Sequence, residues 1–295
     1  MQVFYGADPE VFMTYEKKHE DDIFDPRLPY AMPPVVAEQE MGLKAVGGDD
    51  KHPVYITNKD FNVIGDGVAL EVNLNRPCGS WQEMTKLVRF GVEASGELAA
   101  KLGLMLSVKS AVNFDFKNLV KQEWYNNERM LMGIIFGCNP DRDACATGRK
   151  SSTLDASEHP YRYGGGHIHF SGMDEFRKYP LPTVRLLAIM LGNWLLVKNF
   201  EAEVHRLQYY GKPGKYRVQK YKDGTTGIEY RSPSNQWLNY SDTELEEMFS
   251  ITDRAFAQLS DGSASTTIEK YLLRTVQAFE RRDVSMAQGI VEELG

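Results

Sequence analysis

The sequence predicts an α+β fold in which a mostly antiparallel sheet packs on helices. Strand-like segments with alternating apolar residues recur between residues 2 and 234, and several are joined by Gly-containing turns. Helical segments lie between groups of strands, and the chain after residue 240 has a helical pattern to its end. The length of 295 residues is enough for one large domain with a substantial core.

The first quarter of the chain predicts two strand regions separated by a loop. The segment MQVFYGADPEVFMTY alternates and is rich in aromatic residues, which predicts a first strand broken by Pro9. Residues 16–53 are polar and carry Pro and Gly clusters, which indicates a long ordered loop or lid. Residues 54–77 predict a strand, a turn at residues 65–67 and a second strand.

A helix and two further strands are expected next. Ser80, with Glu83 three residues later, forms a capping-box pattern at the start of an amphipathic helix. Residues 104–116 predict one strand after this helix, and residues 164–172 predict another.

A long helix and a hairpin follow. Residues 181–204 predict the helix. Pro182 is compatible with it, because this residue falls in the first turn, where proline is tolerated. Residues 214–234 predict a hairpin whose turn is supplied by residues 223–227.

The C-terminal part of the chain predicts three helices. Ser241 or Asp242 is the expected N-cap of the first, and two shorter helices follow it. We therefore expect a main domain at residues 1–240 and a helical extension at residues 241–295 that packs on the same domain.

Composition narrows the classes of partner and location. The formal net charge is -7, whereas phosphate-backbone binding needs a basic stripe, so we expect no general nucleic-acid binding. Three irregularly spaced cysteines and twelve methionines fit a reducing cytoplasm. The N-terminus lacks a signal-peptide pattern, and the apolar run at residues 186–197 is too short to span a membrane. We expect a cytoplasmic protein without membrane contact, in which this run is a buried core helix.

Four strand-like segments carry polar residues that a buried strand would not choose. In three of them the spacing is i, i+2, which directs both side chains to one face and the intervening residue to the other, core face. These pairs are Glu71 and Asn73, His167 and His169, and Glu229 and Arg231, with Val72, Ile168 and Tyr230 between them, while Asp8, Glu10 and Asp66 complete the set.

Convergence of these faces predicts a site for metal and phosphate. Closely packed carboxylates repel one another unless cations hold them. Mg²⁺ or Mn²⁺ fits best, because hard oxygen ligands dominate the set. Gly165 and Gly166 would let the backbone approach a bulky ligand closely. Basic residues that could offset phosphate charge are Arg162, Lys212, Lys215, Arg217, Lys220 and Arg231.

The same residues also fit less specific interpretations. An isolated acidic pair is usually a solvated strand face, and a histidine pair is often structural. Glu229 and Arg231 also fit simple charge pairing on a hairpin. A zinc site built from Cys138, Cys145 and the two histidines is a further alternative, although the C-x6-C spacing is wide. The chain contains no Walker A sequence, no Rossmann fingerprint and no nucleophile elbow.

Taken in order, these motifs resemble those of the glutamate-cysteine ligase-like carboxylate-amine ligases. They are most similar to the phage and Firmicute branch, the phiEco32-like COOH-NH2 ligases of type 2. The motifs are GADPEVF, GDGVALEVNLNRP, GCNPD, RYGGGHIHFSG, YYGKPGKYR and GIEYRSPSNQW. They extend over residues 6–237, and the helical tail carries no motif that can be transferred.

The resemblance implies the glutamine synthetase fold, a curved antiparallel sheet bent into a funnel and packed by helices. ATP enters one end of such a funnel and amino-acid-like substrates the other, and residues 1–240 would be the catalytic domain. ATP phosphorylates a carboxylate to an acyl phosphate, which an amine then attacks to form an amide, with metals bridging the ATP phosphates.

The motifs and the resemblance together give an expected set of site residues. Where the family can carry Glu-x-Glu on its first strand, this chain has Asp8 and Glu10, so the shorter Asp8 would hold its metal through water. Expected metal ligands are Asp8, Glu10, Asp66, Glu71, His167, His169 and Glu229; expected catalytic residues are Arg231, Glu229 and Arg217; expected ATP contacts are Lys215, Arg162, Gly165, Gly166 and Lys220.

Two other functions remain open at this point. A metal-dependent amide hydrolase would use the same acids and histidines to activate water, and it would turn over without ATP. A catalytically silent module would bind nucleotide or metal and give no product. For the ligase we expect small-molecule carboxylate and amine partners, an amino acid or peptide among them. The location would be the host cytoplasm for a phage protein, and the sequence leaves the oligomeric state open.

Overall fold

The computed structural model of the protein describes most of the chain. The described residues are 2–17, 23–119, 135–136, 142–146, 154–203, 205–220 and 225–295. The GCNPD motif at residues 137–141 and the first part of the predicted hairpin turn, residues 223–224, lie outside them.

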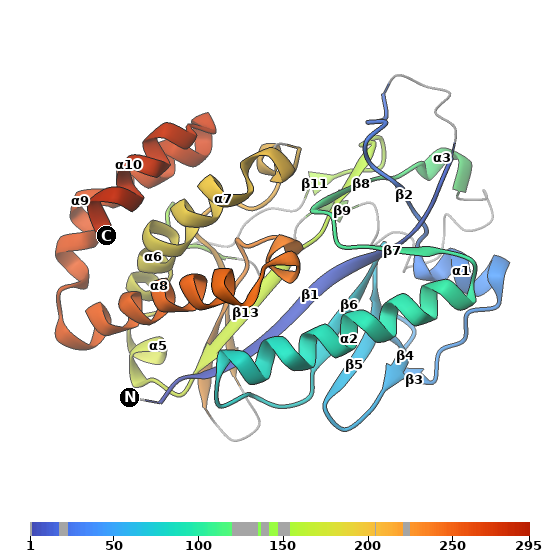
Figure 1. Ribbon diagram of the computed structural model, residues 1–295, viewed down its shortest axis with the longest axis horizontal. Coiled ribbons are helices and arrows are strands. Elements are labelled where there is room, and N and C mark those ends of the chain that lie inside the picture. Colours follow the sequence, from blue (N-terminus) through green and yellow to red (C-terminus); the bar gives the residue numbers. More distant parts are fainter. Residues whose placement is uncertain are drawn as a thin grey trace.

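A large sheet of 13 described strands forms the centre of the molecule (Figure 1). The strands are β1 (Phe4–Tyr15), β2 (Tyr30–Ala31), β3 (Gly47–Gly48), β4 (Pro53–Thr57), β5 (Phe61–Asp66), β6 (Ala69–Leu74), β7 (Met105–Ser107), β8 (Ala111–Asn113), β10 (Arg142–Asp143), β12 (Tyr161–Tyr163), β13 (Gly166–Ser171), β14 (Lys215–Lys220) and β15 (Thr226–Tyr230). The main path runs β10-β14-β15-β13-β1-β6-β5-β4-β3. Its ladders are antiparallel, and the one parallel contact among the described strands joins β2 to β8 off this path. Strands β9 (Ile135–Phe136) and β11 (Leu154–Asp155) form a separate pair.

The helices provide the second layer of this α+β fold. They are α1 (Pro34–Met41), α2 (Trp81–Lys101), α3 (Phe116–Leu119), α5 (Asp174–Lys178), α6 (Pro180–Leu187), α7 (Asn193–Glu203), α8 (Asp242–Asp261), α9 (Ala264–Arg281) and α10 (Val284–Leu294), with the π-helical η2 (Ala188–Gly192) and the 3-10 turns η3 (Arg206–Gln208) and η4 (Asn235–Asn239). Figure 1 shows α2, α6 and α8 on the same side of the sheet.

The hydrophobic core lies between this helix layer and one face of the sheet. Tyr5 and Ala7 of β1 and Ile168 of β13 are buried there with Phe249 and Phe256 of α8. Because side chains alternate along a strand, the residues between them face away from the helices. The opposite face of the same strands is therefore available for polar side chains.

The predicted break at Pro9 is wrong, because β1 is continuous through this residue. The pairing of β1 with β13 ends at Pro9, opposite Gly166, and its pairing with β6 begins at Glu10, opposite Glu71. The two partners flank β1 on opposite sides, so Pro9 lies in a part of the strand that is paired with β13 but not yet with β6. Proline lacks a backbone donor and is tolerated where one side of a strand is unpaired.

The predicted loop at residues 16–53 also needs correction. It contains α1 and two short strands. The helix is held in place because the apolar run at its start buries Val35 and Val36 against Val112 and Phe114. Pro34 supplies the first helical position, where its missing donor costs no hydrogen bond.

Two predicted strands are each divided in the structure. Residues 54–66 form β4 and β5, because the Asn58 side chain accepts hydrogen bonds from the backbone of Asp60 and Phe61 and closes a turn. Residues 104–116 form β7 and β8, which are separated at residues 108–110. The first division follows from local hydrogen bonding between a side chain and the backbone. The second follows from a change of strand partner between β7 and β8.

The predicted helix starts agree with the structure in position. Ser80 accepts a hydrogen bond from the Glu83 backbone N–H, although the Glu83 carboxylate binds the N–H of Gly79 instead of completing the capping box. Ser241 is the N-cap of α8 and forms a full capping box with Glu244.

The long apolar helix is continuous from α6 through η2 to α7. By length and composition the helix at residues 180–203 could cross a membrane, but 72% of its apolar window is buried inside the protein. Leu187, Ile189 and Leu191 have no exposed surface. This burial supports the predicted core helix.

The C-terminal helices share the core of the preceding chain. Leu245 of α8, Tyr271 of α9 and Ile290 of α10 belong to the same hydrophobic cluster as Ile168 of β13. The division of the chain into two parts at residue 240 stays a prediction.

Two glycines of α2 offer a test of the contact between this helix and the sheet. A Cβ atom at Gly91 would lie 2.3 Å from Val72 Cγ1, whereas one at Gly96 would come no nearer than 3.8 Å to Leu106. We expect Gly91→Ala to lower the free energy of unfolding by about 1–3 kcal/mol, because overpacking outweighs the gain in helix propensity. Gly96→Ala is the matched control and should raise it by up to about 1 kcal/mol.

Urea unfolding of both variants beside the wild type measures these differences. Equal stabilisation by the two alanines would contradict the close packing of α2 on β6.

Candidate metal and phosphate site

The strand register brings the predicted metal-binding residues together on the face opposite the helices. Asp8 lies opposite His167, Glu10 opposite Glu71, and His169 opposite Glu229. These pairs span adjacent strands of the sheet, β6, β1, β13 and β15. As predicted, the intervening residues Val72, Ile168 and Tyr230 are buried in the core. Residues far apart in the sequence therefore form one polar surface.

The first group of candidate ligands is Asp8, His167 and Glu229, which are all buried. Their ligand atoms lie within 4.8 Å of one another. Nδ1 of His167 is 3.3 Å from Asp8 Oδ1 and 3.8 Å from Glu229 Oε1. His169 lies beside this group, with its Nε2 atom 3.1 Å from the same Asp8 oxygen.

The second group is Glu10, Asp66 and Glu71, which are half-buried and satisfy the same distance limit. Its hydrogen bonds leave much of the negative charge without a cation. Glu10 accepts from the Gly165 backbone N–H at 2.8 Å, and Glu71 accepts from the Asn73 amide at 2.6 Å. Both donors are neutral, so neither hydrogen bond brings a positive charge to Glu10 or Glu71.

The two groups differ in their electrostatics. Burial opposes ionisation of Asp8, but the imidazoles of His169 and His167 hold its pKa below the usual range. Burial likewise opposes ionisation of Glu229, and Arg231 lowers the pKa of that carboxyl. In the second group burial raises the pKa of Glu71 well above its ordinary value, and the charges of Asp8, Asp66 and Glu10 add to the effect. Basic side chains thus offset the carboxylates of the first group, whereas Glu71 in the second group is surrounded mainly by other carboxylates.

The residues present fit a divalent cation. Asp8 Oδ1 lies 3.3 Å from Nδ1 of His167 and 3.1 Å from Nε2 of His169, so one carboxylate oxygen and two imidazole nitrogens meet at one place. Among the described residues, Nε2 of His167 is also buried without a hydrogen-bond partner, which is a costly arrangement for a polar atom. Carboxylate oxygens are the preferred ligands of Mg²⁺ and Mn²⁺, and an imidazole is compatible with Mn²⁺.

Basic and amide side chains surround the Glu229 carboxylate. Arg231 donates to one of its oxygens and also lies 3.3 Å from His167 Nδ1, while Arg217 approaches the other oxygen at 3.5 Å. Gln219 donates to this second oxygen as well. Gln219 is not among the predicted site residues, although its i, i+2 spacing from Arg217 on β14 indicates a shared face.

The residues expected to contact ATP lie in different surroundings. Nζ of Lys215 on β14 lies 3.7 Å from Oδ2 of Asp143. Lys220 is exposed at the end of β14, and strand alternation puts it on the face opposite to Arg217. Arg162 is buried on β12, and its guanidinium donates to three backbone carbonyl oxygens and stacks over the Phe114 ring. These contacts favour an anchoring role for Arg162 over phosphate binding.

The two glycines are required by the protein's own packing. A Cβ at Gly165 would lie 2.4 Å from His167 Nε2, and one at Gly166 would lie 2.0 Å from the Ser234 carbonyl oxygen. Gly165 therefore lets the histidine lie against the backbone, and Gly166 lets β13 pack on the chain that follows β15. The close approach seen here is to a side chain and a backbone group of this chain, and the expected approach to a bound ligand stays a prediction.

A hollow of about 140 Å³ lies next to His169, beside the first group of candidate ligands. Gly6 and Ser171 contribute to its lining, and Asn73 and Arg76 lie on another side. Its lining combines amides, a hydroxyl, an imidazole and a guanidinium, which suits a small polar molecule.

The zinc alternative receives no support from the described residues. Cys145 belongs to neither group of candidate ligands, and burial raises the pKa of its thiol to about 12, with Asp143 adding to the effect. A thiolate is the form that binds zinc. Cys138 lies outside the described residues.

Comparison with known proteins assigns no function to these residues. No protein-family model matches the chain, and no curated protein matches it.

Repulsion within the second group predicts a stability effect that depends on pH. A raised folded-state pKa stabilises the fold below the ordinary carboxyl pKa, and this contribution is lost as pH rises through the folded value. The raised pKa of Glu71 therefore makes the metal-free protein progressively less stable as pH rises above the ordinary carboxyl pKa. We expect Glu71→Gln to raise the free energy of unfolding at pH 8 in EDTA by about 1 kcal/mol, with a smaller gain at about pH 5.

Thermal unfolding at both pH values measures this effect, with the exposed Glu97→Gln on α2 as the matched control. Saturating Mn²⁺ should stabilise the wild type more than Glu71→Gln, because the variant loses a ligand. A Glu71→Gln protein that is less stable than the wild type in EDTA would contradict the unrelieved repulsion.

Proposed function

We propose that the protein is an ATP-dependent carboxylate-amine ligase that forms an amide through an acyl phosphate. One observation carries the proposal: two adjacent carboxylate groups lie on one sheet face, and an arginine, Arg231, contacts Glu229 of the first group. Two neighbouring cation sites beside a guanidinium form an arrangement suited to polyphosphate. The motif order described above supports the same function and the finer expectation of a curved, funnel-shaped sheet.

The residues of the chain would each contribute a defined part. Glu229 and Asp8, with His167, would hold one divalent cation, and Glu10 and Glu71, with Asp66, would hold another. When bound, Mg²⁺ or Mn²⁺ would neutralise charge on the β and γ phosphates of ATP. Arg231 is buried against Glu229 and would add positive charge next to the transferred phosphoryl group.

Burial of the first group supports a reaction that must exclude water. His167 is 1% exposed and Glu229 is 0% exposed. An acyl phosphate that reaches water is hydrolysed and its ATP is consumed without product, so a dry centre favours transfer to an amine. The small polar hollow beside His169 is the proposed position of one of the two small-molecule substrates.

Metal-dependent release of ADP from ATP, measured with pooled amino acids and small amines, tests this proposal. We expect wild-type activity to require Mg²⁺ or Mn²⁺ and to rise with particular carboxylate and amine pairs. Glu229→Gln should lower the rate at least about 100-fold, since changes to groups that merely support metal ligands already cost 10–100-fold.

Glu269→Gln, an exposed change of the same chemistry on α9, is the control and should retain the wild-type rate. Amide cleavage without ATP would instead establish the hydrolase. Metal binding with neither ADP nor cleavage would establish the binding module.

A further inference from the structure

A second buried ionic cluster lies outside the candidate metal site, at the end of the long core helix. Glu203 is the last residue of α7, and Arg206 begins η3. Their side chains are 3.0 Å apart, and Arg206 is only 1% exposed. Removing such a pair from water is expensive, so its presence in a core requires good geometry and additional hydrogen bonds.

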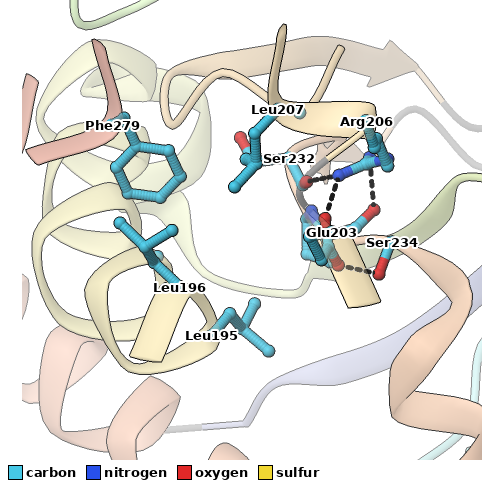
Figure 2. A pocket seen from close by; sticks show the side chains of 11 residues that line it. Leu195, Leu196, Glu203, Arg206, Leu207, Ser232, Ser234 and Phe279 are labelled. Atoms are coloured by element: carbon cyan, nitrogen blue, oxygen red, sulfur yellow. Dashed lines mark hydrogen bonds and ion pairs between the residues drawn. The ribbon is translucent and has the colours of Figure 1, made fainter. Parts of the chain in front are cut away.

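Among the described residues, the further side-chain hydrogen bonds of this pair reach one short segment, residues 232–234, which directly follows Arg231. Arg206 donates to the carbonyl oxygens of Ser232 and Pro233, each at 3.1 Å. Glu203 accepts from the Ser234 hydroxyl. Figure 2 shows Glu203 and Arg206 facing Ser232 and Ser234 across these bonds. Both members of the ion pair therefore hold the same stretch of main chain.

This segment is joined directly to the candidate site. The Pro233 carbonyl oxygen that accepts from Arg206 also accepts from the Gly166 backbone N–H at 2.9 Å. Gly166 immediately precedes His167 on β13, and Arg231 immediately precedes Ser232. One carbonyl group thus links the Arg206 guanidinium to the strand that carries the histidine pair.

The surroundings of the pair are largely apolar. A cavity of about 20 Å³ lies beside it and is lined on its other side by Leu195, Leu196 and Phe279, as Figure 2 shows. A space of this size holds about one water molecule. Low local polarity strengthens the hydrogen bonds of Arg206 to the 232–234 segment and makes their loss costly.

We propose that the Glu203–Arg206 ion pair is a positioning element for the candidate site. It fixes the main chain at residues 232–234, and through this segment it sets the place of Arg231 beside His167. Neither Glu203 nor Arg206 belongs to the two groups of candidate metal ligands, so the pair acts through Arg231. The expected effect on catalysis rests on the proposed ligase function, whereas the expected effect on the position of Arg231 does not.

The test uses the full-length protein and a readout of Arg231 itself. In ¹H–¹⁵N spectra the buried Nε–H group of Arg231 gives a signal that Arg231→Lys removes and so assigns. We expect Arg206→Lys and Glu203→Gln to move or broaden this signal. In the ADP assay both variants should lower kcat by about 10- to 100-fold while the KM for ATP changes less than about two-fold, because the lost interaction acts in the transition state.

Arg89→Lys is the matched control. Arg89 also binds one carboxylate, that of Asp242, and one carbonyl oxygen, that of Tyr240, but it lies on α2 away from residues 232–234. It should leave the Arg231 signal and kcat unchanged. Ser234→Ala removes a single hydroxyl and carries the test if the charged variants do not fold.

The outcomes separate this proposal from the proposed function. An unchanged Arg231 signal in the folded variants overturns the positioning role, whatever the activity. A wild type without metal-dependent ADP release overturns the ligase, and the Arg231 signal then still decides the positioning role. A moved signal with unchanged kcat refutes the catalytic consequence.

Discussion

Five carboxylates share one face of the central sheet, and the electrostatic cost of holding them together governs the rest of the site. Glu229 is fully buried and offset by Arg231, and Asp8 is offset by the two imidazoles. Glu10 and Glu71 accept hydrogen bonds from neutral donors, which leaves their mutual repulsion in place. Such a surface is unfavourable by itself and becomes favourable when cations bind. The same imbalance that lowers stability therefore indicates what the site binds.

The fold separates the source of stability from the source of function. The helix side of the sheet supplies the apolar core, in which Ile168, Phe170 and Tyr230 are fully buried. The other face of the same strands carries the polar residues, and the alternation of side chains keeps the two roles apart. Burial on the helix side contributes free energy that offsets the charge clustered opposite it.

Rigid support surrounds the polar face. Gly165 and Gly166 allow β13 to approach its neighbours, and the segment after β15 is bonded to β13 and to Arg206. Chemistry on phosphate depends mainly on position and fixed charge, so a site of this kind needs its arginine and carboxylates in a set geometry. The Glu203–Arg206 pair supplies part of this geometry from the opposite side of the segment.

The sequence by itself determined the α+β class, the long core helix and the face on which most of the site residues lie, because these depend on local periodicity. A spacing of i, i+2 fixes that His167 and His169 share a face wherever the strand lies. Only the tertiary structure decided that Asp8 lies opposite His167, since register between distant strands depends on packing along the whole sheet. The same holds for the continuity of β1 through Pro9, which depends on its two partner strands, and for Glu203 and Arg206, whose burial no local pattern indicates.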